Sequence, residues 1–281
     1  MSLPDFLIIG AMKCGTSTLQ AQLACQSGVF MTTPKEPNYF SNDEIFARGP
    51  DWYQELFAAA EPGFLKGEAS THYTKLPTYP RTLERMQAAL PEPRLIYMIR
   101  DPMTRAVSHY IHEWTEGRLG GDVDEAFRRT PEIESYGCYG MQIAPFVSAY
   151  GTNRILLTSL EQLTAEPEAE FSRIAAFLGL PEGAAWRHDV AAQNVSAKRT
   201  RRLPMQGLLI DNPVARRVRH VLVPKRVRAW VRARRSMADR PELSADLKAR
   251  FQARFIEDRT QLADFFPGHP ALDLCYPFVP R

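Results

Sequence analysis

One stretch near the N-terminus decides the fold: Phe6-Leu7-Ile8-Ile9-Gly10-Ala11-Met12-Lys13-Cys14-Gly15-Thr16-Ser17-Thr18-Leu19. Its first four residues form a short apolar run, which is typical of a strand buried on both faces. A loop containing two glycines follows, and a helix is predicted from about Thr16 to Cys25. Such a loop lets backbone N–H groups converge on an anion at the helix N-terminus. The stretch therefore predicts an α/β protein with an anion site at its first strand–helix junction.

Strands and helices alternate along the rest of the chain. Further strands are predicted at 64–68, 94–99 and 154–158, and further helices at 82–90, 102–116 and 168–178. This alternation favours βαβ units and a central parallel sheet flanked by helices. Near the C-terminus, apolar residues at helical spacing predict a core-facing helix that carries Leu247, Phe251, Phe255, Asp258 and Leu262.

Composition places the chain among ordinary globular proteins. Its 281 residues are 44% hydrophobic and 24% charged, which excludes a disordered, collagenous or disulfide-scaffold protein. We predict one domain over residues 1–281, with a core at about 4–200 and a basic, mostly helical part at 201–281. No apolar run approaches the roughly 18 residues of a transmembrane helix, and the N-terminus lacks the features of a secretory signal.

The four cysteines are scattered without the spacing of a metal site or a disulfide framework; they are Cys14, Cys25, Cys138 and Cys275. This usage fits a reduced, cytoplasmic setting.

Charge is distributed unevenly. Residues 198–235 carry thirteen Lys or Arg against one acid, Asp211, so that this stretch has a net charge of +12 and the rest of the chain −9. Such a block attracts phosphates, sulfates, acidic polymers or an anionic membrane surface, and it is equally compatible with a solvated basic face.

The lysine in the first loop is not where a nucleotide triphosphatase carries it. In that class, Lys comes directly after the second glycine and is followed by Ser or Thr. Here Lys13 lies two residues before Gly15, and Thr16 and Ser17 take the positions after it. The sequence also offers no clear strand that ends in an acidic residue suited to magnesium. The ammonium of Lys13 is therefore expected to contact a different part of the bound anion than the lysine of a nucleotide triphosphatase does.

This loop resembles that of the sulfotransferases that use 3′-phosphoadenosine-5′-phosphosulfate (PAPS), which reads Lys-x-Gly-Thr-Ser/Thr after the first strand. The resemblance implies a P-loop, nucleotide-kinase-like sulfotransferase fold in which Lys13 contacts the oxygen that bridges phosphate and sulfate. An ammonium there stabilises the negative charge that develops on the leaving phosphate oxygen. The predicted donor-binding residues of the loop are Lys13, Cys14, Gly15, Thr16, Ser17 and Thr18.

A second part of the family signature concerns the 3′-phosphate of the donor. The family holds it with an Arg at a strand end and a Ser eight residues later, matched here by Arg100 and Ser108. Arg suits a phosphate because its guanidinium donates two hydrogen bonds at once. Lys198 and Arg199 resemble the family's basic loop over the cofactor phosphates, although its Lys-Gly-Arg form is absent. The resemblance covers about residues 4–200.

Two residues are candidates for the base that takes the acceptor proton. The sequence Lys35-Glu36-Pro37-Asn38-Tyr39-Phe40 resembles the Lys-Glu-x-x-Phe-Phe stretch of the heparan sulfate sulfotransferases, whose glutamate is the proposed base. Glu36 is therefore the first candidate. The rival is His112, since the heparan N-sulfotransferase has a histidine four residues beyond its 3′-phosphate serine. One helical turn separates Ser108 from His112, so both share a helix face.

One departure from the heparan-type pattern bears on the acceptor. Heparan 3-O-sulfotransferases read Glu-Lys-Ser/Thr where this chain reads Glu68-Ala69-Ser70, so the lysine that meets an acidic sugar is missing. Another Lys or Arg could substitute for it. Trp186 could stack on adenine, but a core position is the more ordinary interpretation.

The resemblance implies a bacterial-type, PAPS-dependent O-sulfotransferase that releases adenosine 3′,5′-bisphosphate. We expect a carbohydrate or small-molecule acceptor hydroxyl, no nucleic acid and no metal, because Lys13, the loop amides and Arg100 supply positive charge. A P-loop kinase-like enzyme is one alternative. A non-catalytic protein that binds acidic polymers through residues 198–235 is another, and that stretch could also contact a membrane surface. The sequence leaves the oligomeric state open.

Overall fold

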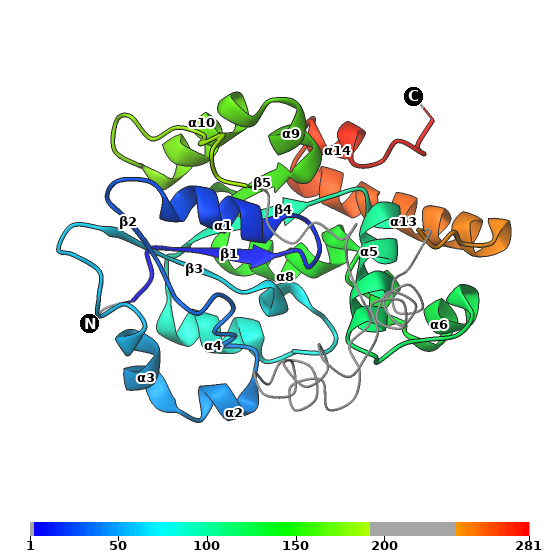
Figure 1. Ribbon diagram of the computed structural model, residues 1–281, viewed down its shortest axis with the longest axis horizontal. Coiled ribbons are helices and arrows are strands. Elements are labelled where there is room, and N and C mark those ends of the chain that lie inside the picture. Colours follow the sequence, from blue (N-terminus) through cyan, green and yellow to red (C-terminus); the bar gives the residue numbers. More distant parts are fainter. Residues whose placement is uncertain (1–2, 192–239, 281) are drawn as a thin grey trace, which may run out of the picture.

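The computed structural model describes residues 3–191 and 240–280 (Figure 1). Its described strands form one parallel sheet in the order β2-β3-β1-β4-β5. The strands are β1 (Phe6–Gly10), β2 (Val29–Met31), β3 (Leu65–Ala69), β4 (Arg94–Ile99) and β5 (Ile155–Ser159). The prediction of an α/β fold with a central parallel sheet is therefore confirmed.

Helices connect the strands and follow the last of them. Those before β4 are α1 (Thr16–Ala24), α2 (Asp43–Phe46), α3 (Gly49–Glu55), the 3-10 helix η1 (Thr71–Thr74) and α4 (Thr82–Ala89). Between β4 and β5 lie α5 (Pro102–Thr115), α6 (Val123–Arg129), α7 (Glu132–Ser135), α8 (Tyr139–Tyr150) and the 3-10 helix η2 (Thr152–Arg154). After β5 come α9 (Leu160–Ala165), α10 (Pro167–Leu178), α13 (Ala245–Phe265) and α14 (Ala271–Leu274).

The centre of the sheet is buried on both faces. Every residue of β1 is buried, and in β4 only Arg94 is not. Met98 and Tyr97, adjacent in β4, point to opposite faces because strand side chains alternate. The Met98 side meets the start of α1 at Gly15, whereas the Tyr97 ring lies 6.2 Å from that of Tyr139 in α8. Helices α1 and α8 thus cover opposite faces, as a three-layer α/β fold requires.

The C-terminal helix α13 packs against α8 (Figure 1). Gly140 allows this approach, because a Cβ there would lie 2.5 Å from the carbonyl oxygen of Asp258. The carboxylate of Asp258 accepts hydrogen bonds from the backbone N–H groups of Gly140 and Met141, both at 2.8 Å, and so caps the first turn of α8. All five residues of the predicted stripe are buried in α13, which confirms that it faces the core.

Predicted element bounds agree with the structure to within one or two residues. The sequence analysis missed β2, which has three residues, and the helices α2, α3, α6, α7, α9 and α14, which have seven or fewer. Elements of this length show too little periodicity to be recognised. It also missed the twelve-residue helix α8, which contains Pro145, a residue that disfavours the interior of a helix. In the part of the chain that the structure describes, no helix is long and apolar enough to cross a bilayer. Lys198, Arg199 and the whole basic stretch 198–235 lie outside the described residues.

Candidate active site

The predicted site residues follow strands that end at the same edge of the sheet. Lys13 follows β1, Arg100 follows β4 and Glu36 follows β2. After β1 the chain turns towards β2 and after β4 towards β5, so the connections diverge between these neighbouring strands. Ligands of open α/β sheets bind in the crevice at such a switch point, beyond the carboxyl ends of the strands. We call residues 10–18 and 100–108 the loop side, and residues 35–38 and 68–75 the turn side.

Neighbouring elements anchor the loop after β1. The N–H of Ala11 donates to the carbonyl of Met98 in β4 at 2.6 Å, and the Thr74 hydroxyl donates to the carbonyl of Ile9 at 2.8 Å. Gly15 caps α1 with a φ of 92°, and a Cβ there would lie 2.9 Å from Leu160. Only glycine meets both demands without strain. Gly15 has no side chain that could cap α1, and the partial positive charge of the helix N-terminus favours an anion.

The backbone of Lys13 is left-handed, with a φ of 68°. The next residue, Cys14, is fully buried: its Sγ lies 3.5 Å from the hydroxyl of Tyr139, and its N–H donates to the carbonyl of Ala11. Burial raises the pKa of the Cys14 thiol to about 12. The side chain of Cys14 therefore belongs to the core. The prediction that Cys14 binds the donor remains a prediction, and it concerns the backbone N–H of this residue.

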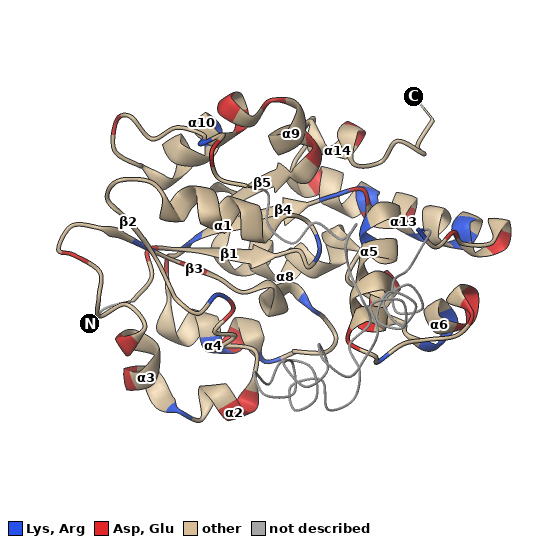
Figure 2. Ribbon diagram, viewed as in Figure 1, with Lys and Arg blue, Asp and Glu red and all other residues tan. Residues whose placement is uncertain are grey.

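Arg100 ends β4 on the loop side of the site. Its carbonyl accepts a hydrogen bond of 2.7 Å from Tyr139, and the next N–H, of Asp101, donates to Glu161 at 3.0 Å. The carboxylate of Asp101 in turn caps α5 by accepting from the N–H of Met103 at 2.9 Å. Ser108 is buried two turns along the same helix. In Figure 2, Lys and Arg occur in the loop after β1 and where β4 meets α5.

Arg240, which precedes α13 in the C-terminal part of the chain, contacts the start of α5 on the loop side. The sequence analysis did not predict this residue. Its guanidinium donates to the carbonyl of Thr104 in the first turn of α5 at 3.3 Å. Burial, followed by the charge of Arg100, lowers the pKa of Arg240, so the two guanidinium groups are close enough to repel each other. Nothing in the sequence around residue 240 relates it to Arg100, which lies 140 positions earlier.

Glu36 occupies a strained turn that is tied to the end of β3. Its φ is 59°, and its N–H donates to the carbonyl of Ala69 at 3.0 Å. The carboxylate pairs with Lys35 at 2.8 Å and accepts from the Thr71 hydroxyl at 3.2 Å. Burial alone would raise the pKa of Glu36, but the charges of Lys35 and Lys75 outweigh it and hold the pKa below 4.5. Glu36 is therefore ionised at neutral pH and able to accept a proton.

His112 lies in the last turn of α5, half-buried, one turn after Ser108 as predicted. The neighbouring His109 is a structural residue. It is buried and stacked on Tyr136, with a ring separation of 5.6 Å, and its Nε2 lies 3.7 Å from Glu113. Burial lowers the pKa of His109 to about 4.

A second carboxylate on the turn side, Glu68, is wholly buried. It accepts hydrogen bonds from the hydroxyls of Tyr53, Ser70 and Tyr73. Burial raises the pKa of Glu68 despite these donors. The Ser70 hydroxyl also accepts from the N–H of Asn38 at 3.0 Å, so Glu68 holds the turn that carries Glu36.

Lys75 is a further residue that the sequence analysis missed. It directly follows η1, its side chain is buried, and its ammonium lies 5.7 Å from the ring centroid of Tyr136. Burial, above all, lowers the pKa of Lys75 to about 8. Ala69 stands where the heparan 3-O-sulfotransferase pattern has a lysine. This difference was the one signal in the sequence that a cation should be sought at another position nearby.

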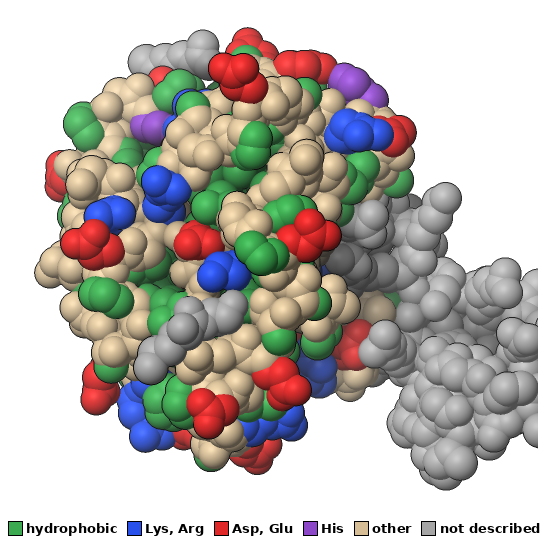
Figure 3. All heavy atoms as spheres, turned by 90° about the vertical axis from the view of Figure 1, so that its left-hand side faces the viewer, with side chains coloured by type: hydrophobic (Ala, Val, Ile, Leu, Met, Phe, Trp, Pro, Cys, Tyr) green, Lys and Arg blue, Asp and Glu red, His purple; other side chains and the backbone are tan. Residues whose placement is uncertain are grey.

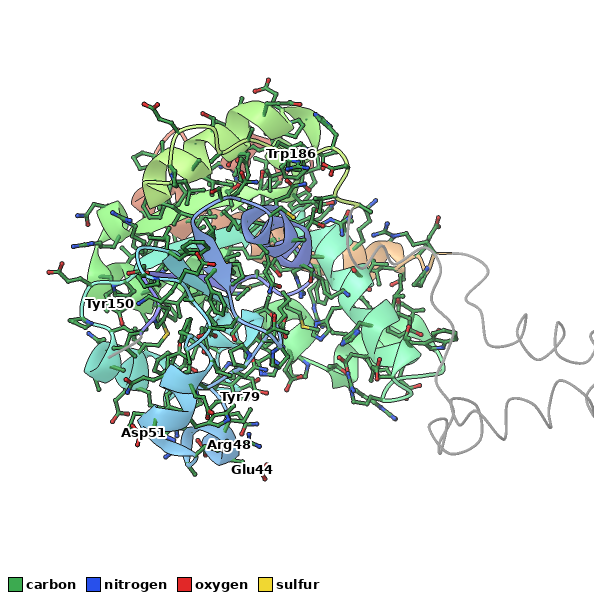
Figure 4. All side chains as sticks on the ribbon, turned by 60° about the vertical axis from the view of Figure 1, so that its left-hand side comes forward. Glu44, Arg48, Asp51, Tyr79, Tyr150 and Trp186 are labelled. Atoms are coloured by element: carbon green, nitrogen blue, oxygen red, sulfur yellow. The ribbon has the colours of Figure 1, made fainter. Side chains whose placement is uncertain are left out.

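Two other features lie apart from these residues. Trp186 packs edge-on against Phe171 of α10, with ring centroids 6.1 Å apart, and lies beside that helix in Figure 4. A hollow beside β2 and α3 is lined by Phe30, Thr33, Trp52, Glu55, Leu56 and Ala59.

On the face drawn in Figure 3, acidic and basic side chains are interspersed with apolar ones. Residues 3–191 and 240–280 contain no group of three or more His, Cys, Asp or Glu suited to a metal.

The family model described as "Sulfotransferase domain" matches residues 3–262. Heparan sulfate glucosamine 3-O-sulfotransferase 3B1 of Mus musculus is 29% identical over 194 residues, which cover 63% of this chain and 46% of that protein. The bifunctional heparan sulfate N-deacetylase/N-sulfotransferase 2 of Homo sapiens is 27% identical over 203 residues, with coverages of 63% and 22%. The chain thus spans less than half the length of these relatives.

Among solved structures, a sulfotransferase from Alicyclobacillus acidocaldarius superposes with a TM-score of 0.69 over 97% of this chain and 99% of that one. The two sequences are 21% identical, so this likeness concerns the fold. It extends over nearly the whole length of both chains, in agreement with the predicted sulfotransferase architecture.

Proposed function

Because this chain belongs to the sulfotransferase family, we propose that it transfers the sulfuryl group of PAPS to an acceptor hydroxyl and releases adenosine 3′,5′-bisphosphate. The acceptor is proposed to be a carbohydrate or a small molecule. The names of the heparan sulfate relatives support the carbohydrate, whereas Ala69 departs from their pattern. The four thiols are unpaired, which supports a reducing, cytoplasmic setting.

One observation carries the proposal. Among the described residues, three that are not glycine have positive φ: Lys13, Glu36 and Asn38. Left-handed backbone is costly for such residues and concentrates at functional sites, where the surrounding structure maintains it. Two of the three are the residues that the family resemblance assigns to leaving-group stabilisation and to proton removal. They follow different strands at one edge of one sheet.

The proposed reaction is a single in-line displacement. The acceptor oxygen attacks sulfur while its proton passes to the carboxylate of Glu36. The bond between sulfur and the bridging oxygen breaks, and its electron pair stays on the 5′-phosphate, where the Lys13 ammonium and the N-terminus of α1 stabilise the charge. Arg100 and Ser108, with Arg240 beside them, are proposed to hold the 3′-phosphate.

We propose Glu36 rather than His112 as the base. The pKa of Glu36 is lowered by its cationic neighbours, so the carboxylate is available across the neutral range. A carboxylate of low pKa is a weak base in the free protein. Bound PAPS brings negative charge close to it, and a like charge raises the pKa of a carboxylate towards the working pH.

The test is to incubate the protein with labelled PAPS and a panel of candidate acceptors, and to identify the sulfated product by mass spectrometry. Binding of PAPS, PAP (adenosine 3′,5′-bisphosphate) and ATP should be compared by calorimetry with and without magnesium. We expect PAPS and PAP to bind without the metal. Binding of ATP that depends on magnesium, with no binding of PAP, would instead support the kinase-like alternative.

A further inference from the structure

Lys75 carries a buried charge that has no ionic partner in the described chain. Lys75 is 7% exposed, and its ammonium makes no hydrogen bond or ion pair with residues 3–191 or 240–280. It approaches the ring of Tyr136 in a cation–π arrangement. Because an unpaired charge is costly to bury, proteins keep one chiefly where a ligand completes it.

The backbone on both sides of Lys75 is held firmly. Just before it, the Thr74 hydroxyl donates to the carbonyl of Ile9, where the first loop begins. Just after it, the N–H and the carbonyl of Leu76 pair with the side-chain amide of Gln142 at 2.7 and 2.8 Å. The backbone that carries Lys75 is thus tied to the loop side through Ile9 and to α8 through Gln142, and its buried side chain is not that of a surface lysine folded back by chance.

The two acids whose charges reach Lys75 already have partners. Glu36 pairs with Lys35 at 2.8 Å, and Glu113 accepts two hydrogen bonds from Arg118, at 2.5 and 3.0 Å. Arg105 contributes further positive charge to the surroundings of Lys75. Positive charge therefore remains uncompensated beside the candidate base, and an anion that entered here would neutralise it.

We propose that Lys75 is an oxyanion-binding residue, and that its ammonium binds an anionic oxygen where donor and acceptor meet. This inference rests on the proposed function. The oxyanion has two possible sources: the non-bridging oxygens of the sulfuryl group that is transferred, or an acidic group on the acceptor. In either case Lys75, which directly follows η1, supplies the positive charge that Ala69 of β3 does not supply.

The test compares Lys75→Met with the wild-type protein and with Lys248→Met, which removes an exposed lysine on α13. Calorimetry measures the dissociation constants of PAPS and of PAP, which lacks the sulfuryl group. A second titration measures binding of glucuronate and of glucose to the PAP-loaded protein. A melting curve of each unliganded variant accompanies both titrations.

If Lys75 binds the sulfuryl group, Lys75→Met weakens PAPS binding by about 10- to 100-fold and leaves PAP binding unchanged. If it binds an acidic acceptor group, both nucleotides bind normally and the glucuronate binding is lost, while that of glucose is kept. In both cases the melting temperature of the variant is unchanged or higher, because an unpaired buried charge has been removed.

The inference is overturned if the PAPS affinity stays unchanged and no glucuronate binding depends on Lys75. It is also overturned if the variant melts lower and binds PAPS and PAP equally weakly, since Lys75 is then a structural residue. A wild-type protein that binds neither nucleotide contradicts the proposed function itself, which separates the two failures.

Discussion

The loop side and the turn side meet at one edge of the sheet but are built differently. The loop side consists of two junctions at which a strand is followed by a helix, β1 with α1 and β4 with α5. At each junction the backbone N–H groups, the helix N-terminus and the basic residue, Lys13 or Arg100, lie close together in the sequence. On the turn side, the carboxylate of Glu36 is fixed through β3 and η1, by Ala69, Ser70 and Thr71. The first is a local motif, whereas the second is an assembly of segments about 30 residues apart.

This difference matters for catalysis because the two sides are assigned opposite tasks. In the proposed reaction, the loop side gathers positive charge for the phosphates of the donor. The turn side combines one ionised carboxylate with a buried ammonium, to which we assign the acceptor proton and an oxyanion. Changes on the loop side should therefore alter donor binding or departure, and changes on the turn side should alter acceptor activation.

The largest effect is expected from Glu36→Gln. The amide keeps the shape of the side chain but cannot take a proton, so turnover should fall by about 100- to 10,000-fold while PAP affinity stays within about twofold. Steady-state kinetics and calorimetry measure the two quantities. Glu44→Gln, an exposed glutamate of α2 labelled in Figure 4, is the matched control. An active Glu36→Gln alongside an inactive His112→Asn would transfer the role of base to the histidine.

Lys13→Ala should have the second largest effect on turnover. Its ammonium is proposed to act on the leaving oxygen as charge develops, so turnover should fall by about 100-fold or more, well beyond any loss of PAPS affinity. Single-turnover kinetics at saturating PAPS isolate this step. The exposed lysine variant Lys248→Ala should behave as wild type. Turnover within a few-fold of wild type for Lys13→Ala would show that the loop holds no phosphosulfate.

Arg100→Ala tests the remaining part of the loop side. Loss of a charged donor to the 3′-phosphate should weaken PAP by about 10- to 100-fold and leave 5′-AMP, which lacks that phosphate, almost unaffected. Arg240→Ala should act in the same direction with a smaller effect, because its side chain is more exposed. Calorimetry with both nucleotides measures the contrast, and Arg129→Ala on α6 is the control. An equal loss of affinity for PAP and for 5′-AMP would show that Arg100 does not bind the 3′-phosphate.

Glu68→Gln should distinguish the two carboxylates of the turn side. Glu68 accepts three hydroxyl hydrogen bonds in a fully buried position, so the variant should lose about 1–3 kcal/mol of unfolding free energy. Glu36→Gln should lose much less, because Glu36 is partly exposed. Chemical denaturation measures both. A Glu68→Gln protein as stable as wild type would mean that this network does not support the turn.

The smallest effect concerns pH. The pKa of Glu36 in the free protein lies below 4.5, so its ionic contribution to stability is fully present above that pH and is lost as the pH falls through the lowered pKa. The difference in stability between wild type and Glu36→Gln should therefore be constant at neutral pH and vanish under acidic conditions. NMR titration of the Glu36 carboxyl carbon, without and with PAP, should show a higher pKa when the nucleotide is bound. A pKa above 4.5 in the free protein would contradict the assigned influence of Lys35 and Lys75.

The sequence alone determined the strands β1, β3, β4 and β5, the parallel sheet and the glycine loop after the first strand. These features are local: an apolar run or a glycine pair is legible in consecutive residues, because strand and helix periodicity places their side chains directly. Glu36, Arg100 and Ser108 were reached only through a family resemblance. A glutamate before a proline, or an arginine before a helix start, has no chemical signature of its own.

Tertiary structure alone decided the rest of the site. Lys75 becomes a buried, uncompensated ammonium only because η1 packs against the first loop and Gln142 holds Leu76. Arg240 reaches Arg100 only because the C-terminal segment returns to the first turn of α5. Burial and charge at a point in space depend on which distant segments converge there, and a single sequence carries no local pattern for that convergence.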